Sequence, residues 1–193
     1  TWYSTAGGFD YSWSPDGKWF TLEFTGNKHD PYSDIGLVSA EGGKDIINLT
    51  NSGYMSGYPR FALDGNAILF TTERYGMRAH ASWGSLNDAM LVFLNQDAYD
   101  KYCLSKEDYE LRKELEKEQK KSAGKDTPQG KNKDKKKKYD KKDSNADEKD
   151  DQPKDIVVEL KGIEDRVVRL TPNSSDMGST IISKDGETLY YLA

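Results

Sequence analysis

Short stretches of aromatic and β-branched residues alternate with polar turn residues along most of the chain. Such stretches flank an Asp-Gly dipeptide three times, at Asp16, Asp64 and Asp185. Short runs bounded by turn residues are typical of β-hairpins. The strands predicted around these turns cover residues 9–14, 19–25, 58–63, 67–72, 180–183 and 189–192. In the first turn, Ser-Pro-Asp-Gly suits a type I turn, because Pro fixes φ and Gly admits positive φ.

A second marker repeats in register with these turns. The marker is a Leu-Thr pair, found at Leu49-Thr50 and at Leu170-Thr171. In each pair the threonine precedes the aspartate of the next Asp-Gly dipeptide by 14 residues. The interval from Asp16 to Asp64 is 48 residues, close to one four-stranded propeller blade of about 40–50 residues. The sequence therefore predicts an all-β fold, a partial β-propeller of about three blades, each a four-stranded antiparallel sheet.

The interval from Asp64 to Asp185 is 121 residues, which indicates an insertion. Residues 105–152 contain 16 Lys/Arg and 14 Asp/Glu, only two of the 22 aromatic residues, and no Asp-Gly turn. We therefore place an insertion inside the second blade in preference to a lost blade. The expected organisation is a first blade at 1–52, three strands of a second at 53–104, the insertion at 105–152, the end of the second blade at 153–172 and the start of a third at 173–193.

Further strands are predicted at residues 33–39, 45–49, 89–95 and 166–170, with one more short strand at 156–160. From Gln96 the pattern changes to a loose helical spacing, and Ser105 followed by acidic residues is typical of a helix start. After about residue 122 no apolar residue suited to burial in a core follows until Ile156, so this part is predicted to be disordered.

Composition and charge exclude several classes of protein. The longest apolar run, residues 89–94, is far shorter than the roughly 20 residues of a membrane-spanning helix. A net charge of −5 argues against nucleic-acid binding. The Lys-rich residues 131–142 are balanced by nearby aspartates, so we favour a solvated loop there.

The single cysteine, Cys103, forms no internal disulfide and is expected to be a small buried apolar residue. Five aromatic residues in predicted strands are expected to pack between blades: Trp13, Trp19, Phe24, Phe61 and Phe70.

The connection from Arg74 to Asp88 is the candidate binding loop. It holds Arg74, Arg78, His80 and Trp83 and is longer than a hairpin requires. Arginine can hold a peptide carboxylate with two hydrogen bonds, and tryptophan can anchor a partner. The alternative is that Trp83 packs on a neighbouring blade and the arginines pair with acids there.

No catalytic residue, metal site or cofactor is assigned from the sequence. His80 lies near Ser82, and Asp34 or Asp88 could orient it, but Ser82 lacks the strand–turn–helix elbow of a hydrolase nucleophile. Asp30 and Asp34 share a loop but fit no calcium-binding pattern.

The motif Trp13-Ser14-Pro15-Asp16-Gly17 and the Leu-Thr markers resemble the repeat of TolB-type and tricorn-type β-propellers. Residues 73–78, 91–107 and 162–170 resemble the propeller part of bacterial tricorn-like serine peptidases. In that family a PDZ module and a serine-peptidase core of the C-terminal-processing type follow the propeller. The resemblance implies that this chain is non-catalytic, that it admits or docks peptide or protein substrates, and that the protein is exported or periplasmic, with a cytoplasmic location also open. Nothing in the chain matches the nucleophile of that family or its partners.

Two alternatives remain open at this stage. One is a TolB-like propeller that binds or scaffolds proteins, and the other is the propeller of an oligopeptidase with an α/β-hydrolase domain. Three blades do not close a ring, so the expected partners are further blades, the downstream PDZ and peptidase domains, or a second copy of the chain.

Overall fold

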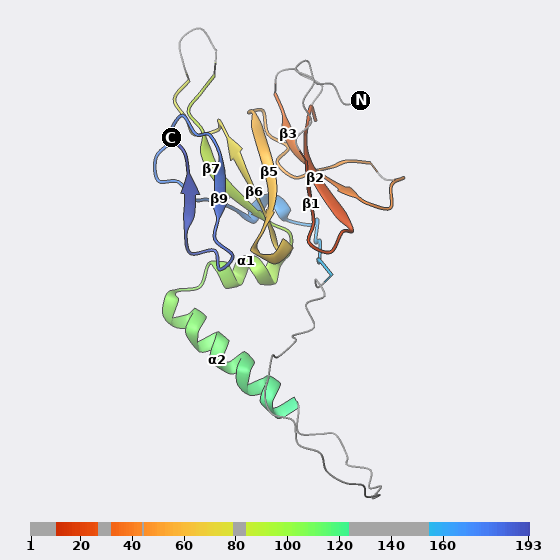
Figure 1. The fold of residues 1–193 in the computed structure, drawn as a ribbon, viewed down its shortest axis with the longest axis vertical. Coiled ribbons are helices and arrows are strands. Elements are labelled where there is room, and N and C mark those ends of the chain that lie inside the picture. Colours follow the sequence, from red (N-terminus) through yellow and green to blue (C-terminus); the bar gives the residue numbers. More distant parts are fainter. Residues whose placement is uncertain (1–10, 27–31, 44, 79–83, 124–154) are drawn as a thin grey trace, which may run out of the picture. The chain divides into compact units, whose positions relative to one another are not determined.

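The computed structural model describes residues 11–26, 32–43, 45–78, 84–123 and 155–193. The chain divides into two compact units, one of Thr1–Asp100 with Pro153–Ala193 and the other of Lys101–Gln152. The first unit contains the strands, which form separate antiparallel sheets (Figure 1). The predicted fold class, an all-β partial β-propeller, is confirmed.

The first sheet has the order β1-β2-β3-β4, so each strand pairs with its neighbour in sequence. Its strands are β1 (Tyr11–Trp13), β2 (Trp19–Phe24), β3 (Asp34–Ser39) and β4 (Ile47–Asn48). All four fall in the ranges predicted from the sequence. This up-and-down arrangement of four short strands is that of a propeller blade.

The second sheet repeats this order with β5 (Ser56–Ala62), β6 (Ala67–Thr72), β7 (Asp88–Phe93) and β8 (Val167–Arg169). Strand β8 pairs with β7 although the whole charged segment lies between them in sequence, with Met90 opposite Arg169. A third sheet pairs β9 (Thr180–Ile182) with β10 (Leu189–Tyr191). Strands β6, β8, β9 and β10 lie within the predicted ranges, whereas β5 begins two residues and β7 one residue before its predicted start.

The core lies between the first two sheets. Ile35 and Leu37 of β3 belong to the same buried cluster as Ile68 and Phe70 of β6 and Met90 of β7. Every residue of β6 and β7 is buried, including the side chains that point away from the first sheet. Burial on both faces explains why residues 89–94 read as one continuous apolar run with no alternation.

Three of the five aromatic residues pack in or against the core as expected, whereas Phe24 is half-buried outside that cluster and Trp13 is exposed. Phe70 is buried, and Trp19 and Phe61 pack against the core cluster. Trp13, in contrast, is 54% exposed and lies over Phe20 with ring centroids 5.5 Å apart. The prediction that Trp13 is a core residue was wrong, because β1 is an end strand of its sheet and its outward-facing positions reach solvent.

Two of the three Asp-Gly turns have the same hydrogen bonds. In the first, the Asp16 carboxylate accepts from the Ser14 hydroxyl and the Lys18 N–H, and Gly17 N–H donates to Ser14 O at 3.0 Å. Ser183, Asp185, Gly186 and Glu187 repeat these contacts in the third sheet. Gly17 and Gly186 have φ of +69° and +79°, as the predicted turn requires.

The middle turn differs although its loop has the same length. Ala62 and Leu63 stand where the first turn has Ser14 and Pro15. Leu63 and Asp64 adopt φ of +52° and +54°. The serine is the residue that matters, because Lys184 also replaces the proline in the third turn, which keeps the contacts of the first turn. Asp64 has no serine hydroxyl to hold it, and its carboxylate lies 3.4 Å from the Lys184 ammonium of the third turn.

The predicted short strand at residues 156–160 does not form. Ile156 N–H donates to the Asp16 carboxylate, and Glu159 N–H donates to Leu94 O. These bonds go to separate parts of the two blades, so the segment forms no strand ladder. The buried Arg166 then donates to Phe93 O at 3.2 Å, to Lys161 O at 3.0 Å and to Glu159 O. We call residues 155–166 the return segment.

The second unit is helical in its described part. Helix α1 (Gln96–Tyr102) enters it, and helix α2 (Lys106–Ala123) follows. Ser105 caps α2 as predicted, since its hydroxyl accepts the Asp108 N–H and donates to the Asp108 carboxylate.

Cys103 is exposed, so the prediction of a buried residue was wrong, and nearby Leu111 and Leu115 are exposed as well. The disorder predicted beyond residue 122 concerns 124–154, which lie outside the described residues. Neither described helix is long and apolar enough to cross a membrane.

Candidate functional site

The predicted binding loop forms a hairpin that extends the second sheet. Arg78 pairs with Ser85, and Leu86 N–H donates to Met77 O at 3.2 Å. Gly76 lies so close to the returning chain that a Cβ there would stand 1.7 Å from Leu86 O, which leaves room only for glycine. Asn87 and Ser175 then exchange two backbone hydrogen bonds of 2.8 and 3.1 Å. We call the described part of this connection, residues 73–78 and 84–87, the β6–β7 hairpin.

Two of the four predicted site residues are described, and both lie on this hairpin. The Arg74 guanidinium carbon is 5.6 Å from the ring centroid of Tyr75, and that of Arg78 is 5.9 Å from the ring of Tyr54. Arg74 and Arg78 are exposed, as are Tyr75 and Met77. His80 and Trp83 lie outside the described residues, so their roles stay predictions.

A third arginine, which the sequence did not point to, lies against Tyr75. The Arg169 guanidinium carbon is 5.1 Å from the centroid of that ring. Tyr75 therefore has a guanidinium from its own hairpin and another from β8. Cation–π contacts of this kind hold a guanidinium in place while part of it stays available to an anion.

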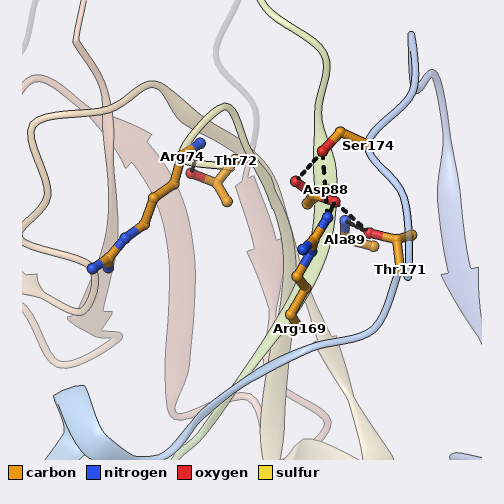
Figure 2. A network of polar contacts seen from close by, with 7 residues as sticks. All are labelled: Thr72, Arg74, Asp88, Ala89, Arg169, Thr171 and Ser174. Atoms are coloured by element: carbon orange, nitrogen blue, oxygen red, sulfur yellow. Dashed lines mark hydrogen bonds and ion pairs between the residues drawn. The ribbon is translucent and has the colours of Figure 1, made fainter. Parts of the chain in front are cut away.

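Arg169 is anchored by Asp88, a fully buried carboxylate at the start of β7 (Figure 2). One Asp88 oxygen accepts from Arg169 Nε at 3.1 Å and Nη2 at 2.9 Å, and from the Thr171 hydroxyl at 2.7 Å. The other accepts from Ser174 at 2.8 Å. Thr171 Oγ1 also accepts the Ala89 N–H at 3.3 Å. In the same view Arg74 lies apart from this network, and its backbone N–H donates to the Thr72 hydroxyl.

The first blade contains the same contact in the same place. Asp34, at the start of β3, accepts from Thr50 Oγ1 at 2.7 Å and from Asn48 Nδ2 at 2.9 Å. Thr50 Oγ1 accepts the Ile35 N–H at 3.1 Å. The Leu-Thr marker therefore supplies a hydroxyl that links a buried aspartate to the strand that the aspartate begins.

These contacts assign Asp34 and Asp88 a role that sequence reasoning missed. Both are candidates to orient a histidine in the sequence, but their described partners are the side chains of nearby residues and the Ser52 N–H. The sequence does hold a signal, since an Asp directly precedes each apolar third strand. The role is structural, because a buried carboxylate must be fully hydrogen-bonded.

Glu73, at the base of the hairpin, has a raised pKa. Partial burial disfavours its charged form and raises the pKa, while the positive charge of Arg78 opposes that effect. Arg78 therefore acts on Glu73 as well as on the hairpin surface. Among the described residues, no group of three or more His, Cys, Asp or Glu side chains could hold a metal ion.

The fold and the repeated Asp–Thr contact define a propeller-type repeat protein. No family model and no curated protein matches this chain. Among solved structures, the chain is similar to one described as the crystal structure of the tricorn protease, with 11% identity and a TM-score of 0.46. The match covers 89% of this chain and 14% of that one.

Proposed function

We propose that this chain is a non-catalytic β-propeller segment of a tricorn-like serine peptidase, and that it docks peptide or protein substrates for a separate protease domain. The motifs at residues 13–17, 73–78 and 162–170 support the family. The same resemblance supports a bacterial protein that is periplasmic or exported, with a cytoplasmic location as the alternative. The observation that carries the docking role is the exposed surface of the β6–β7 hairpin.

That surface combines charge with adaptable apolar groups. Arg74 and Arg78 each hold a guanidinium over a tyrosine ring and remain exposed. A guanidinium in this position can form two hydrogen bonds with a peptide carboxylate while it stays on the ring. Met77 is 80% exposed and Tyr75 is 49% exposed, and both can cover an apolar side chain next to that carboxylate.

The test uses the full-length protein that contains this chain. Steady-state cleavage of fluorogenic peptides is measured for the unchanged protein and for Arg74→Gln and Arg78→Gln. We expect each variant to raise KM about tenfold with kcat unchanged, because docking binds substrate and transition state equally. Lys161→Gln is the matched control, since it removes an exposed positive charge from the return segment.

Two results would contradict the proposal. Equal KM values for all four proteins would remove the hairpin from substrate docking. Peptide binding without cleavage, with no peptidase core in the full-length protein, would instead support a scaffolding propeller.

A further inference from the structure

A cleft lies between the first strands of the two blades, apart from the β6–β7 hairpin. Strands β1 and β5 contact each other, and each is an end strand of its sheet. The cleft has a volume of about 290 Å³. Its lining residues come from these two strands only and are Tyr11, Ser12, Tyr58, Pro59, Arg60 and Phe61. This volume is at the lower end of small-ligand pockets, so the cleft suits a short group and not a folded partner.

The backbone on one side of the cleft is strained. Tyr58 has φ of +56°, a left-handed backbone conformation that residues other than Gly and Asn rarely adopt. It lies in a register irregularity of β5 between Gly57 and Arg60, next to Pro59, which has no N–H to offer. The result of this conformation is a tyrosine that lines the cleft and stays 57% exposed. Strain that places an aromatic side chain in a cleft motivates a functional hypothesis for that residue.

Arg60 supplies a positive charge that the described residues do not neutralise. Its side chain is exposed and lines the cleft, and it forms no ion pair within the described part of the chain. In a chain with a net charge of −5, such a guanidinium is available to an outside anion. One arginine beside tyrosines matches a single carboxylate next to an apolar group better than a polyanion, which needs several positive charges.

We propose that this cleft binds a peptide carboxylate, with Arg60 as its ion-pair partner and the Tyr58 ring as the wall against the adjoining side chain. Ser12 belongs to the same lining, and a serine hydroxyl can donate to the second carboxylate oxygen. The site differs from the β6–β7 hairpin in strands and residues, so it stands whether or not the hairpin docks substrates.

The test is a fluorescence-polarisation titration of the full-length protein. The probes are a fluorescein-labelled pentapeptide that ends in Phe with a free carboxylate, its neutral C-terminal amide, and the amide with Glu next to Phe. We expect the neutral amide to bind at least about tenfold more weakly than the better acidic peptide. Whichever acidic peptide binds more tightly shows whether the carboxylate belongs to a chain end or to a side chain.

Variants then assign the binding to this cleft. Arg60→Gln is expected to weaken the acidic peptide about tenfold, whereas Lys161→Gln, which removes an exposed charge that is not in the lining, leaves binding unchanged. Tyr58→Gly removes the ring and relieves the backbone strain. It is expected to weaken binding while the melting temperature holds or rises, which separates a loss of the site from a loss of the fold.

The proposal is overturned by any of three results. These are no saturable binding up to about 1 mM peptide, equal binding of the neutral amide, and equal effects of Arg60→Gln and Lys161→Gln. Arg74→Gln and Arg78→Gln serve as cross-controls. Binding that depends on them and not on Arg60 would assign the peptide to the hairpin and reject the cleft.

Discussion

At the scale of single residues, Asp34 and Asp88 show how each blade fixes its third strand. Both carboxylates are almost completely buried, and both accept a hydrogen bond of 2.7 Å from the threonine of a Leu-Thr pair. The same hydroxyl accepts the N–H of the next strand residue, Ile35 or Ala89. A threonine at this position therefore satisfies a buried anion and a strand N–H together.

Replacing this hydroxyl should be costly for the fold. We predict that Thr171→Val, which keeps the shape of the side chain, lowers the free energy of unfolding by about 1–3 kcal/mol, because the buried Asp88 loses a donor. Urea denaturation measures the change. Thr171→Ser retains the hydroxyl and should lose clearly less. An equal loss in the valine and serine variants would show that packing of the methyl group, and not the hydrogen bond, matters there.

Asp16 makes the stability depend on pH in a defined direction. Burial alone would raise its pKa, but hydrogen bonds from Ser14, from Ile156 N–H and from Lys18 N–H outweigh it, so the pKa lies below the ordinary 3.8. A lowered pKa in the folded state means that the ionised form stabilises the fold above about pH 4. This contribution is lost as the pH falls through the folded-state pKa.

We therefore predict that Asp16→Asn reduces the free energy of unfolding at neutral pH and that the difference from the unchanged protein shrinks below about pH 4. Denaturant titrations at several pH values measure it. Asp185 gives the comparison, because the Ser183 hydrogen bond also lowers its pKa. Asp185 lacks the bond to the return segment, so Asp185→Asn should have the smaller effect. A difference that grows toward acidic pH would contradict the prediction.

At the scale of elements, the strands were predictable because each is a short apolar run between turn residues. The Ser-Pro-Asp-Gly turn was also predictable, since both its φ angles and its hydrogen bonds follow from residue chemistry. The middle turn has another conformation because Ala62 has no hydroxyl, whereas Ser14 and Ser183 each donate to the aspartate of their turn. The segment 156–160 has strand-like residues, but its Ile156 and Glu159 N–H groups donate to the Asp16 carboxylate and to Leu94 O, and periodicity alone does not reveal these partners.

The candidate site was predictable only in part. The length and composition of residues 74–88 pointed to a binding loop, yet not to its hairpin form, which depends on Gly76 meeting Leu86. The role of Arg169 was hidden because its partners, Tyr75 and Asp88, are far away in sequence. The cleft between β1 and β5 depends on contact between two blades and on the conformation of Tyr58. Neither can be predicted from the residue types alone.

Gly76 offers a test of the hairpin as an element. We predict that Gly76→Ala destabilises the protein by about 1–3 kcal/mol, because the new methyl group would overlap Leu86 O and force the two hairpin strands apart. Thermal and urea unfolding measure it. Gly53→Ala is the matched control, since a Cβ there meets nothing within 4 Å, and it should be neutral or slightly stabilising. Equal unfolding energies for the two variants would show that the close approach at Gly76 is easily relieved.

At the scale of the whole molecule, the return segment ties the blades together. Asp16 of the first blade binds Ile156 N–H, while Leu94 O and Phe93 O at the end of β7 accept from Glu159 N–H and Arg166. On the other side of the insertion, Gln96 N–H donates to the Glu159 carboxylate at 2.8 Å. The chain on both sides of the insertion is therefore hydrogen-bonded to the sheet, and the two sides are hydrogen-bonded to each other. All of these bonds are made by residues outside 101–152.

This fastening predicts that the charged part of the insertion is dispensable for stability. Replacing residues 122–152 with a Gly/Ser linker of equal length keeps every hydrogen bond of the return segment, so we expect the melting temperature to change by no more than about 2 °C. Calorimetry measures it. Arg166→Met is the contrasting variant, because it leaves the carbonyls of Phe93, Glu159 and Lys161 without a buried donor, and it should lower the melting temperature by several degrees. A large drop on linker replacement would mean that residues 122–152 stabilise the fold themselves, and the stability of the blades would then extend beyond the return segment.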